Sequence, residues 1–408
     1  MKTFDVPVAY RSPLISAIKK KRKEEDRMKK DFSPTLLDLG PLRIYLARHF
    51  GFCYGVENAI DIAFRTIEEN EGKRIFLLSE MIHNPQVNAD LLNAGVRFLQ
   101  DTKGRTLVPF EELTADDIVL IPAFGTTLEI EKKLSAIGIA TETYNTTCPF
   151  VEKVWNRSDA IARNAYTIVI HGKPDHEETR ATFSHAAAGA PAVVVRDMAQ
   201  ARELAAFVAG ERPAAEFNEA FKGQHSQGFD PQRDLQRIGV VNQTTMLASD
   251  TQAIADLLKE TITKRFGSES ATVKDHFADT RDTLCYATND NQTAVKGLLS
   301  VPADLAIVVG GYNSSNTSHL VELLEDKLPT YFIDHADKIL FRESITHYDF
   351  HTATESITEH FLPDREPVTV LITSGASCPD AVVEGVIKKL AGFYPASLSL
   401  DAMLERFR

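Results

Sequence analysis

The sequence predicts an α/β protein in which parallel sheets are covered by helices. Three observations support this fold class. Short apolar runs rich in β-branched residues recur along the chain, each run is followed by a polar or glycine-rich loop, and each loop leads into a helical pattern. Strands that alternate with helices in this way are typical of parallel sheets with helices on both faces.

The clearest repeats of this pattern place polar loops directly after the expected strands. Ligands of parallel sheets bind beyond the carboxyl ends of the strands, so these loops are candidate binding positions. None of the loops matches the GxGxxG fingerprint or the P-loop, and the common nucleotide-binding motifs are therefore absent. The repeats are "DIVLIPAFGTTLEIEKKL" at 117–134, "YTIVIHGKPDHEETRATF" at 166–183, "LAIVVGGYNSSNTSHLVELL" at 305–324 and "VTVLITSGASCPDAVVEGVIKKL" at 368–390.

Composition and charge limit the class of protein. A chain of 408 residues, 43% apolar and 25% charged, is typical of a globular protein of two or three domains. The formal net charge of -12 argues against nucleic-acid binding as the main function. No apolar run is long enough to span a membrane and the N-terminus lacks the apolar core of a secretory signal, so we expect a cytoplasmic protein.

Two segments depart from the repeating pattern. The charge run "AIKKKRKEEDRMKK", between Pro13 and Pro34, predicts an exposed helix, which we interpret as a solvated arm with a basic docking surface as the alternative. The acidic residues inside this run argue against a transit peptide. The stretch of about 210–237 is polar and weakly patterned, which indicates a surface insertion.

The cysteines are the strongest chemical signal in the chain. Cys53, Cys148, Cys285 and Cys378 lie far apart, and any one of them alone is more often a buried small hydrophobe than a ligand. The first three each lie just ahead of an expected helix, whose N-terminus favours a thiolate. No CxxC pair is present, which argues against an ordinary zinc site or a bacterial ferredoxin cluster. Three distant thiolates could instead hold a 4Fe–4S cluster with one iron left open as a Lewis acid, and spacing alone leaves the choice open.

Eight short motifs, in order, resemble the 4-hydroxy-3-methylbut-2-enyl diphosphate reductase (LytB) family. The resemblance covers about residues 42 to 395. The segments "PAFGTT", "WN" and "HGKPDHEET" are most similar to the plant and cyanobacterial branch of the family. The motifs are "GFCYGVENAI", "EMIHNPQV", "TTCPFVEKVWN", "IHGKPDHEET", "NQTTM", "CYATNDNQTAV", "VVGGYNSSNTSHL" and "TSGASCPD".

The resemblance implies three similar α/β domains arranged with pseudo-threefold symmetry around a central iron–sulfur cluster. We place these domains at 42–145, 146–270 and 271–408, after an N-terminal charged arm at 1–41 and with the insertion of about 210–237 inside the second domain. Each domain would then contain one cysteine that ligates the cluster.

The resemblance also implies the cofactor and the reaction. Cys53, Cys148 and Cys285 are expected to hold a 4Fe–4S cluster with one open iron, whereas Cys378 is expected not to be a ligand. The family reduces an allylic alcohol diphosphate to isopentenyl and dimethylallyl diphosphates, with two electrons and two protons and release of water. This reaction is the last step of the non-mevalonate isoprenoid pathway.

The polar loops would hold the diphosphate. A helix cap requires one or two hydroxyl or amide side chains, and "GGYNSSNTSHL" contains more than that. A ring of neutral donors together with helix N-termini can bind a diphosphate without fixed cations. The residues that match the family's substrate-binding positions are His83, His176, Thr245, Ser314, Ser315, Asn316 and Ser377.

Glu178 matches the family's acid, and Thr244 matches the residue that contacts the substrate hydroxyl. Hydroxide is a poor leaving group, so C–O cleavage needs a proton donor. The alternative interpretation is that Glu177 and Glu178 only favour the start of a helix. One departure is Phe124, where the better-known bacterial branch has a histidine, and the group that replaces its contact is not identified by the sequence.

The expected partners are a small diphosphate substrate and an electron donor such as a ferredoxin or flavodoxin, with no nucleic acid and no membrane. Two other functions match parts of the pattern. A non-catalytic iron–sulfur protein would need four protein ligands and no polar pocket, and a metal-dependent phosphate-ester hydrolase would work without a reductant. Neither accounts for the three cysteines and the hydroxyl-rich loops together.

Overall fold

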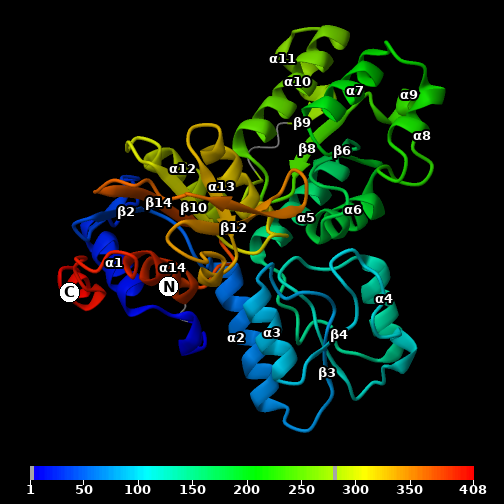
Figure 1. Cartoon of the computed structure of the whole chain (residues 1–408). Coiled ribbons are helices and arrows are strands. Elements are labelled where there is room, and N and C mark those ends of the chain that lie inside the picture. Colours follow the sequence, from blue (N-terminus) through cyan, green and yellow to red (C-terminus); the bar gives the residue numbers. More distant parts are fainter. Residues whose placement is uncertain (1–3, 279–282) are drawn as a thin grey trace. The chain divides into compact units, whose positions relative to one another are not determined.

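The computed structural model describes residues 4–278 and 283–408 of the chain (Figure 1). The chain folds into two compact units, which are described separately. Unit 1 comprises Met1–Asp61, Ile82–Ala89 and Tyr286–Arg408, and unit 2 comprises Ile62–Met81 and Asp90–Cys285.

Unit 1 is built on a five-stranded sheet with the order β1-β2-β14-β10-β11. Four of its strands run parallel, and β1 pairs antiparallel with β2 at one edge. Val370 of the central strand β14 lies opposite Ile44 of β2 on one side and Leu305 of β10 on the other. The strands are β1 (Thr35–Asp38), β2 (Leu42–Leu46), β10 (Leu305–Val309), β11 (Thr330–Ile333) and β14 (Val368–Ser374).

Both faces of this sheet are covered by helices, with α12 and α13 on one face and α1 and α14 on the other (Figure 1). The helices of unit 1 are η1 (Val8–Tyr10), α1 (Pro13–Glu25), α12 (Tyr286–Leu298), α13 (Ser315–Glu325), η4 (Ala336–Lys338), α14 (Asp380–Ala391) and α15 (Leu400–Glu405), and it shares α2 (Tyr54–Glu69) and α3 (Pro85–Asn93) with unit 2.

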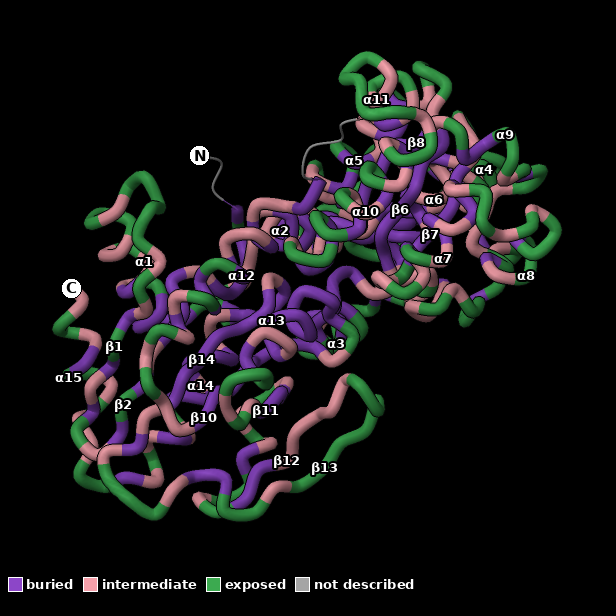
Figure 2. The backbone as a smooth tube through the Cα atoms, turned by 90° about the horizontal axis from the view of Figure 1, so that it is seen from above, coloured by how far each residue is buried: buried purple, intermediate pink, exposed green. Residues whose placement is uncertain are grey.

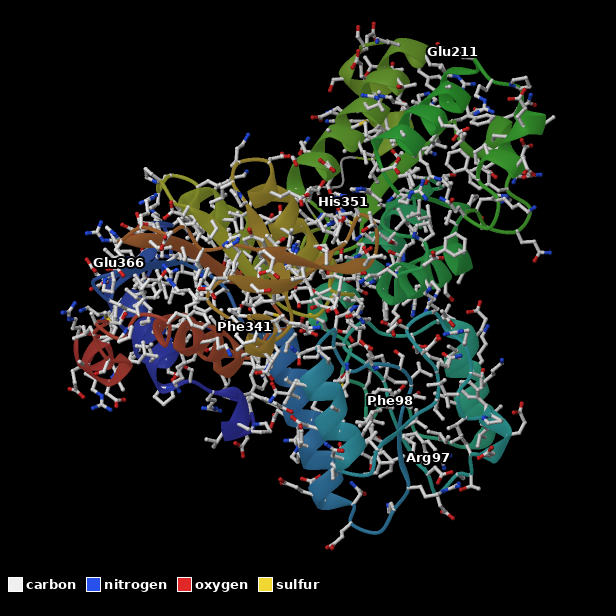
Figure 3. All side chains as sticks on the ribbon, in the orientation of Figure 1. Arg97, Phe98, Glu211, Phe341, His351 and Glu366 are labelled. Atoms are coloured by element: carbon white, nitrogen blue, oxygen red, sulfur yellow. The ribbon has the colours of Figure 1, made fainter. Side chains whose placement is uncertain are left out.

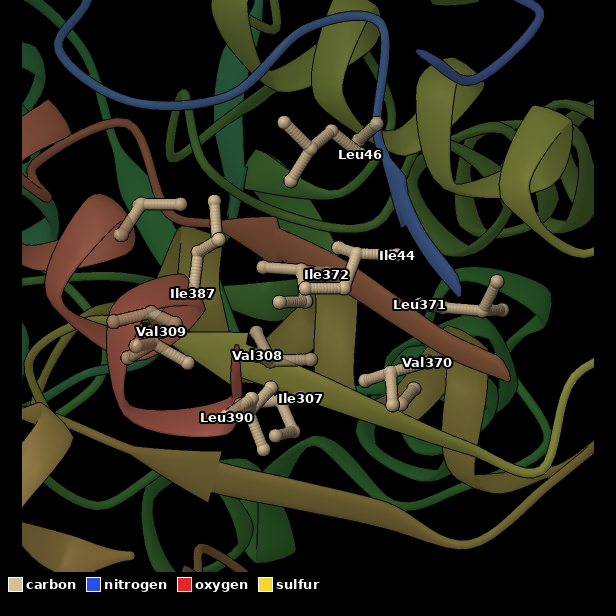
Figure 4. Close-up of a cluster of buried hydrophobic side chains, with 14 of the residues drawn as sticks. Ile44, Leu46, Ile307, Val308, Val309, Val370, Leu371, Ile372, Ile387 and Leu390 are labelled. Carbon is tan, nitrogen blue, oxygen red and sulfur yellow. The ribbon is translucent and has the colours of Figure 1, made fainter. Parts of the chain in front are cut away.

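Apolar residues of the central strands make the core of unit 1. Ile307 of β10 and Ile372 of β14 are fully buried, and Ile387 and Leu390 of α14 pack against the same sheet (Figure 4). Strands that are buried on both faces have no polar face, which is why these runs are continuously apolar and do not alternate.

The prediction for the N-terminal charge run is confirmed in part. The run up to Glu25 lies in helix α1, which begins at Pro13 after the N-cap Ser12, whose hydroxyl accepts a hydrogen bond from the N–H of Ile15. The expectation of a solvated arm is wrong, because Leu14, Ile15 and Ile18 are buried in the core of unit 1. The three apolar residues are spaced along one helical face, so the charges occupy only the opposite face.

A two-stranded antiparallel hairpin of unit 1, β12 (Ser344–Asp349) and β13 (Thr354–Glu359), was not predicted. Strand β13 is mostly exposed, and the hairpin is largely green and pink in Figure 2, whereas β10 and β14 are purple. Among its contacts with the rest of the unit is that of Tyr348, whose ring stacks on the ring of Tyr312 with the centroids 4.3 Å apart. Polar strands without a regular apolar pattern carry a weak sequence signal.

Unit 2 contains two parallel sheets with the strand orders β4-β3-β5 and β7-β6-β8-β9. The strands are β3 (Ile75–Leu77), β4 (Arg97–Phe98), β5 (Ile118–Leu120), β6 (Thr167–His171), β7 (Ala192–Val195), β8 (Ile238–Asn242) and β9 (Phe277–Ala278). The helices are η2 (Phe110–Glu112), α4 (Leu128–Ile137), α5 (Pro149–Ala162), α6 (Glu177–Gly189), α7 (Met198–Ala209), η3 (Ala214–Glu216), α8 (Phe217–Ala220), α9 (Pro231–Asp234), α10 (Ala248–Phe266) and α11 (Ser270–His276).

The predicted surface insertion of about 210–237 is only partly on the surface. Phe217, Phe221 and Phe229 of this stretch are buried, and they pack with Leu235 into the core around β7 and α7. The rings of Phe217 and Phe229 stack at 4.8 Å. A few widely spaced aromatic residues can bury large areas without any periodic pattern, which explains why the stretch looked like a polar loop.

The predicted α/β class with parallel sheets and flanking helices is confirmed. All four repeats form a strand, a loop and a helix, namely β5–α4, β6–α6, β10–α13 and β14–α14. Within the predicted boundaries, β2 belongs to the first domain but pairs with β14 of the third. The division into three domains stays a prediction. Among the described helices, none is long and apolar enough to cross a membrane.

Candidate functional site

The site residues of unit 2 gather around the first turn of α6. Glu178 is 1% exposed, and both of its carboxylate oxygens accept hydrogen bonds from Thr244. The N–H of Thr244 donates to Oε1 at 2.5 Å and its hydroxyl to Oε2 at 3.0 Å. The glutamate is therefore fixed by two donors, and it does more than start a helix.

Thr244 connects this carboxylate to a cysteine. It follows β8, and its carbonyl oxygen accepts the backbone N–H of Cys285 at 3.1 Å. The fully buried Gln243 holds the loop from behind, because its Oε1 accepts from the Lys173 N–H at 3.1 Å and its Nε2 donates to the Thr245 hydroxyl at 2.7 Å. The structure thus brings Glu178, Thr244, Thr245 and Cys285 to one place in unit 2.

Cys148 belongs to the same group of residues. It is the N-cap of α5, and its N–H donates to the carbonyl oxygen of Ala123 at 2.9 Å. Burial raises the pKa of the Cys148 thiol to about 12, and negative charge on Cys285 and Glu178 acts in the same direction. A thiolate at this position therefore requires a positively charged partner. A bound metal ion is such a partner.

The neighbouring Glu177 points elsewhere. It is 6% exposed and accepts a short hydrogen bond from the hydroxyl of Ser79, which follows β3 and is also buried. Two consecutive glutamates at the start of α6 thus have different partners, since Glu177 is bound by Ser79 and Glu178 by Thr244.

His176 is the N-cap of α6, and its Nδ1 accepts the N–H of Glu178 at 3.2 Å. This bond places the proton of the neutral ring on Nε2, which is then a donor. The ring of Phe124 meets the imidazole edge to face, with the centroids 5.6 Å apart. At the position where the bacterial branch has a third histidine, this chain therefore has the apolar ring of Phe124, which contacts His176.

In unit 1 the polar loop after β10 leads into α13. Ser314 is the N-cap of this helix, and its hydroxyl oxygen accepts from the Thr317 N–H at 3.3 Å and from the Thr317 hydroxyl at 2.9 Å. The cap function is thus confirmed for Ser314. Its own hydroxyl proton can still be donated, because both of these bonds use its oxygen as an acceptor.

Ser315 and Asn316 are not used by the cap. The Oδ1 of Asn316 accepts from the Ala376 N–H at 2.9 Å and from Asn291 Nδ2 at 3.4 Å, so the amide is oriented with its Nδ2 on the other side. Within residues 4–278 and 283–408, neither Asn316 Nδ2 nor the hydroxyl of Ser315 has a hydrogen-bond partner, although both are buried. Buried donors of this kind are expected where a polar ligand binds.

His83 and Ser377 join the same loop. His83 Nδ1 lies 2.6 Å from the carbonyl oxygen of Asn313, and the Ser377 hydroxyl donates to the carbonyl oxygen of His83 at 3.0 Å. A Cβ atom on Gly311 would lie 2.4 Å from that carbonyl oxygen, so only glycine permits this close approach. Gly311 thus allows His83 to lie close to the serine-rich loop.

Cys53 is partly buried and directly precedes α2, and its N–H donates to the carbonyl oxygen of Ala376 at 3.1 Å. Unit 1 therefore brings together Cys53, His83, Ser377 and the loop of Ser314 to Asn316. Cys378 is fully buried in the apolar core, where burial raises the pKa of its thiol. Its surroundings are those of a structural residue.

The sequence missed the residues that support the site from behind. Gln243, Asn291 and Ala376 each hold a predicted site residue in place. Gln243 lies inside the motif "NQTTM", but its role depends on hydrogen bonds to residues that are distant in the sequence. No group of three or more His, Cys, Asp or Glu side chains in the described part of the chain is arranged to hold a metal ion.

Comparison with known proteins gives a consistent result. The sequence model of a family described as "LytB protein" matches residues 44–391. A protein of Synechococcus sp. (strain ATCC 27144 / PCC 6301 / SAUG 1402/1), named 4-hydroxy-3-methylbut-2-enyl diphosphate reductase, is 42% identical over 87% of this chain and 86% of its own length. A protein of Prochlorococcus marinus (strain MIT 9211) with the same name is also 42% identical, over 87% of this chain and 85% of its own length.

Two solved structures are also similar. One, described as (E)-4-hydroxy-3-methyl-but-2-enyl diphosphate reductase, the terminal enzyme of the non-mevalonate pathway, has a TM-score of 0.51 and 25% identity and covers 86% of this chain and 99% of its own. The second, a reductase from Plasmodium falciparum, has a TM-score of 0.60 and covers 85% of this chain and 86% of its own. At 20% identity this second likeness shows the fold alone.

Proposed function

The chain belongs to the LytB family, and we propose that it is a 4-hydroxy-3-methylbut-2-enyl diphosphate reductase of the non-mevalonate isoprenoid pathway. It converts the allylic alcohol diphosphate to isopentenyl and dimethylallyl diphosphates with two electrons and two protons, and releases water. The observation that carries the proposal is the contact between Glu178 and Thr244, which places a buried carboxylate and a hydroxyl beside Cys285.

The chain's own residues can deliver the proton that C–O cleavage needs. When Glu178 is protonated, its Oε2 can donate to the Thr244 hydroxyl while that hydroxyl donates its own proton to the substrate hydroxyl, because a hydroxyl is both donor and acceptor. The backbone N–H of Thr244 holds Oε1 meanwhile, so the carboxyl group does not rotate away. The protonated hydroxyl then leaves as water, which is a far better leaving group than hydroxide.

The serine-rich loop of unit 1 provides donors for the diphosphate. Ser315 and Asn316 are at the N-terminus of α13, where the helix dipole favours negative charge. Their buried donors have no partner within the described residues, so the cost of their burial is offset when an anion binds. The other contacts proposed for the substrate are His83, His176, Thr245, Ser314 and Ser377.

Cys53, Cys148 and Cys285 would hold the 4Fe–4S cluster. Each lies at the start of a helix, and Cys148 requires a positive partner to be a thiolate, which fits a metal ligand. When bound, the cluster would pass the two electrons from an external donor to the substrate and would supply Lewis acidity toward the substrate oxygen. The proposed electron donor is a ferredoxin or flavodoxin, and the proposed location is the cytoplasm.

Anaerobic purification followed by iron and sulfide analysis, and then addition of the allylic alcohol diphosphate with an artificial reductant, tests the function. We expect about four irons per chain and formation of both isoprenoid diphosphates. Release of phosphate without a reductant would support a phosphate-ester hydrolase and overturn the proposal. A cluster without any turnover would indicate a non-catalytic iron–sulfur protein.

A further inference from the structure

His319 of α13 is a buried histidine that none of the roles above uses. It is 8% exposed, and its Nδ1 lies 3.0 Å from Oε2 of Glu322, one turn further along the helix. Its other ring nitrogen, Nε2, is buried and has no hydrogen-bond partner among the residues that the structure describes. A buried ring nitrogen without a partner indicates that a ligand completes its hydrogen bonding.

The position of His319 in the helix directs its ring toward the anion-binding turn. The Cα–Cβ bonds of a helix tilt toward its N-terminus, so a side chain covers the turn before its own Cα. For His319 that turn carries Ser315, four residues earlier, and Asn316, three residues earlier. Ser315 and Asn316 also present buried donors without a partner. Three such groups therefore share the start of one helix.

We propose that His319 is a further substrate-binding residue, whose Nε2 donates a hydrogen bond to the diphosphate while Glu322 holds Nδ1. A ring that donates from both nitrogens is an imidazolium, whose positive charge is paired with Glu322 on one side and the diphosphate on the other. The loop then binds its anion with one positively charged side chain, that of His319, in addition to neutral donors. This inference rests on the proposed function, since it assigns His319 to the diphosphate of that substrate.

A matched pair in the same unit provides the control. His351 and Glu325 make the same kind of contact, with Nε2 2.7 Å from Oε1, but His351 is an exposed residue (labelled in Figure 3). The variants are His319→Leu, which removes both ring nitrogens, and His319→Gln, whose amide nitrogen can still donate near the position of Nε2. His351→Leu removes an imidazole with a carboxylate partner that lies outside the loop.

The experiment measures the affinity of the cluster-loaded enzyme for inorganic pyrophosphate by calorimetry, with KM, kcat and melting temperature beside it. We expect His319→Leu to weaken pyrophosphate binding and to raise KM by about tenfold or more, with a much smaller effect on kcat. His319→Gln should recover part of the affinity, and His351→Leu should match the parent. Glu322→Gln, which keeps an acceptor for Nδ1 but removes the charge, should weaken binding by a smaller factor.

The outcomes separate this inference from the proposed function. Parental affinity in His319→Leu, with only a lower melting temperature, would show that His319 is structural and would overturn the inference while leaving the reductase intact. If His319→Leu does not fold, parental affinity in both His319→Gln and Glu322→Gln would overturn it. A parent chain that neither binds pyrophosphate nor reduces the substrate would overturn both.

Discussion

Thr244 donates two hydrogen bonds to Glu178, one from its backbone at 2.5 Å and one from its hydroxyl at 3.0 Å. The two residues are 66 positions apart in the sequence and are brought together by the parallel pairing of β6 with β8. The backbone bond holds the carboxylate whatever the side chain at position 244. Only the hydroxyl can relay a proton from Glu178 to the substrate. Because a substitution at position 244 can remove the hydroxyl and leave the backbone bond, the two contacts can be tested separately.

Glu178→Gln tests the acid. Glutamine keeps the size of the side chain and can still accept the Thr244 N–H, but it cannot deliver a proton. We expect turnover with an artificial reductant to fall by about 10²–10⁴-fold, with unchanged iron content. The matched control is Glu177→Gln, a buried neighbour whose amide can still accept the Ser79 hydroxyl, and it should stay close to the parent. A larger loss in Glu177→Gln than in Glu178→Gln would require the acid to be reassigned.

Thr244→Val tests the path of the proton. Valine has nearly the same shape and leaves the backbone N–H bond to Glu178 in place, but it removes the hydroxyl. We expect kcat to fall by about 10²-fold, because general acid catalysis loses its route to the substrate. Thr244→Ser restores the hydroxyl and should recover most of the rate. Equal rates in the valine and serine variants would show that Glu178 acts directly.

We expect three of the four cysteines to be needed for the cluster and the fourth to be dispensable. Changing Cys53, Cys148 or Cys285 to Ala should each abolish a stable cluster, because two thiolates are a poor ligand set. Cys378→Ala should keep the brown colour and the iron content, because this thiol is buried in the core of unit 1. Iron and sulfide analysis after anaerobic reconstitution measures the difference. Loss of the cluster in Cys378→Ala, together with its retention in Cys53→Ala, would contradict the assignment.

Asn316→Asp isolates one donor of the loop. The carboxylate still accepts the Ala376 N–H at the position of Oδ1, so the fold of the loop should persist. The exchange replaces the Nδ2 donor by a negative oxygen that faces the diphosphate. We expect substrate binding to weaken by about 1–3 kcal/mol or more, seen as a rise in KM. Ser318→Ala is the control, because the Ser318 hydroxyl donates to the Ser314 carbonyl oxygen within the helix. Unchanged KM in Asn316→Asp would remove this residue from the site.

His49 should make the protein less stable in acid. Burial lowers the pKa of its imidazole to about 4 in the folded chain, whereas an unfolded histidine has a pKa of about 6.5. Between these two values the unfolded chain binds more protons, so the free energy of unfolding falls as the pH drops from about 6.5 to about 4. In His49→Gln this fall should be smaller than in the parent, as measured by urea unfolding at several pH values. The exposed His360→Gln should retain the parental slope.

The sequence by itself determined the local architecture. Continuous apolar runs predicted buried parallel strands, and polar loops at their ends predicted where the site residues lie. The cysteine positions predicted the starts of α2, α5 and α12, because residues ahead of a helix have a recognisable local pattern. The cap role of Ser314 followed from its residue type in the same way.

Only the tertiary structure decided which of these residues meet. That β2 pairs with β14, more than three hundred residues later, depends on packing and leaves no local pattern. The same holds for the separate partners of Glu177 and Glu178, which have identical side chains and adjacent positions. The buried face of α1 and the phenylalanines of the 210–237 stretch depend on the surface against which they pack. Local propensity is a property of neighbouring residues, whereas a buried hydrogen bond is a property of the whole fold.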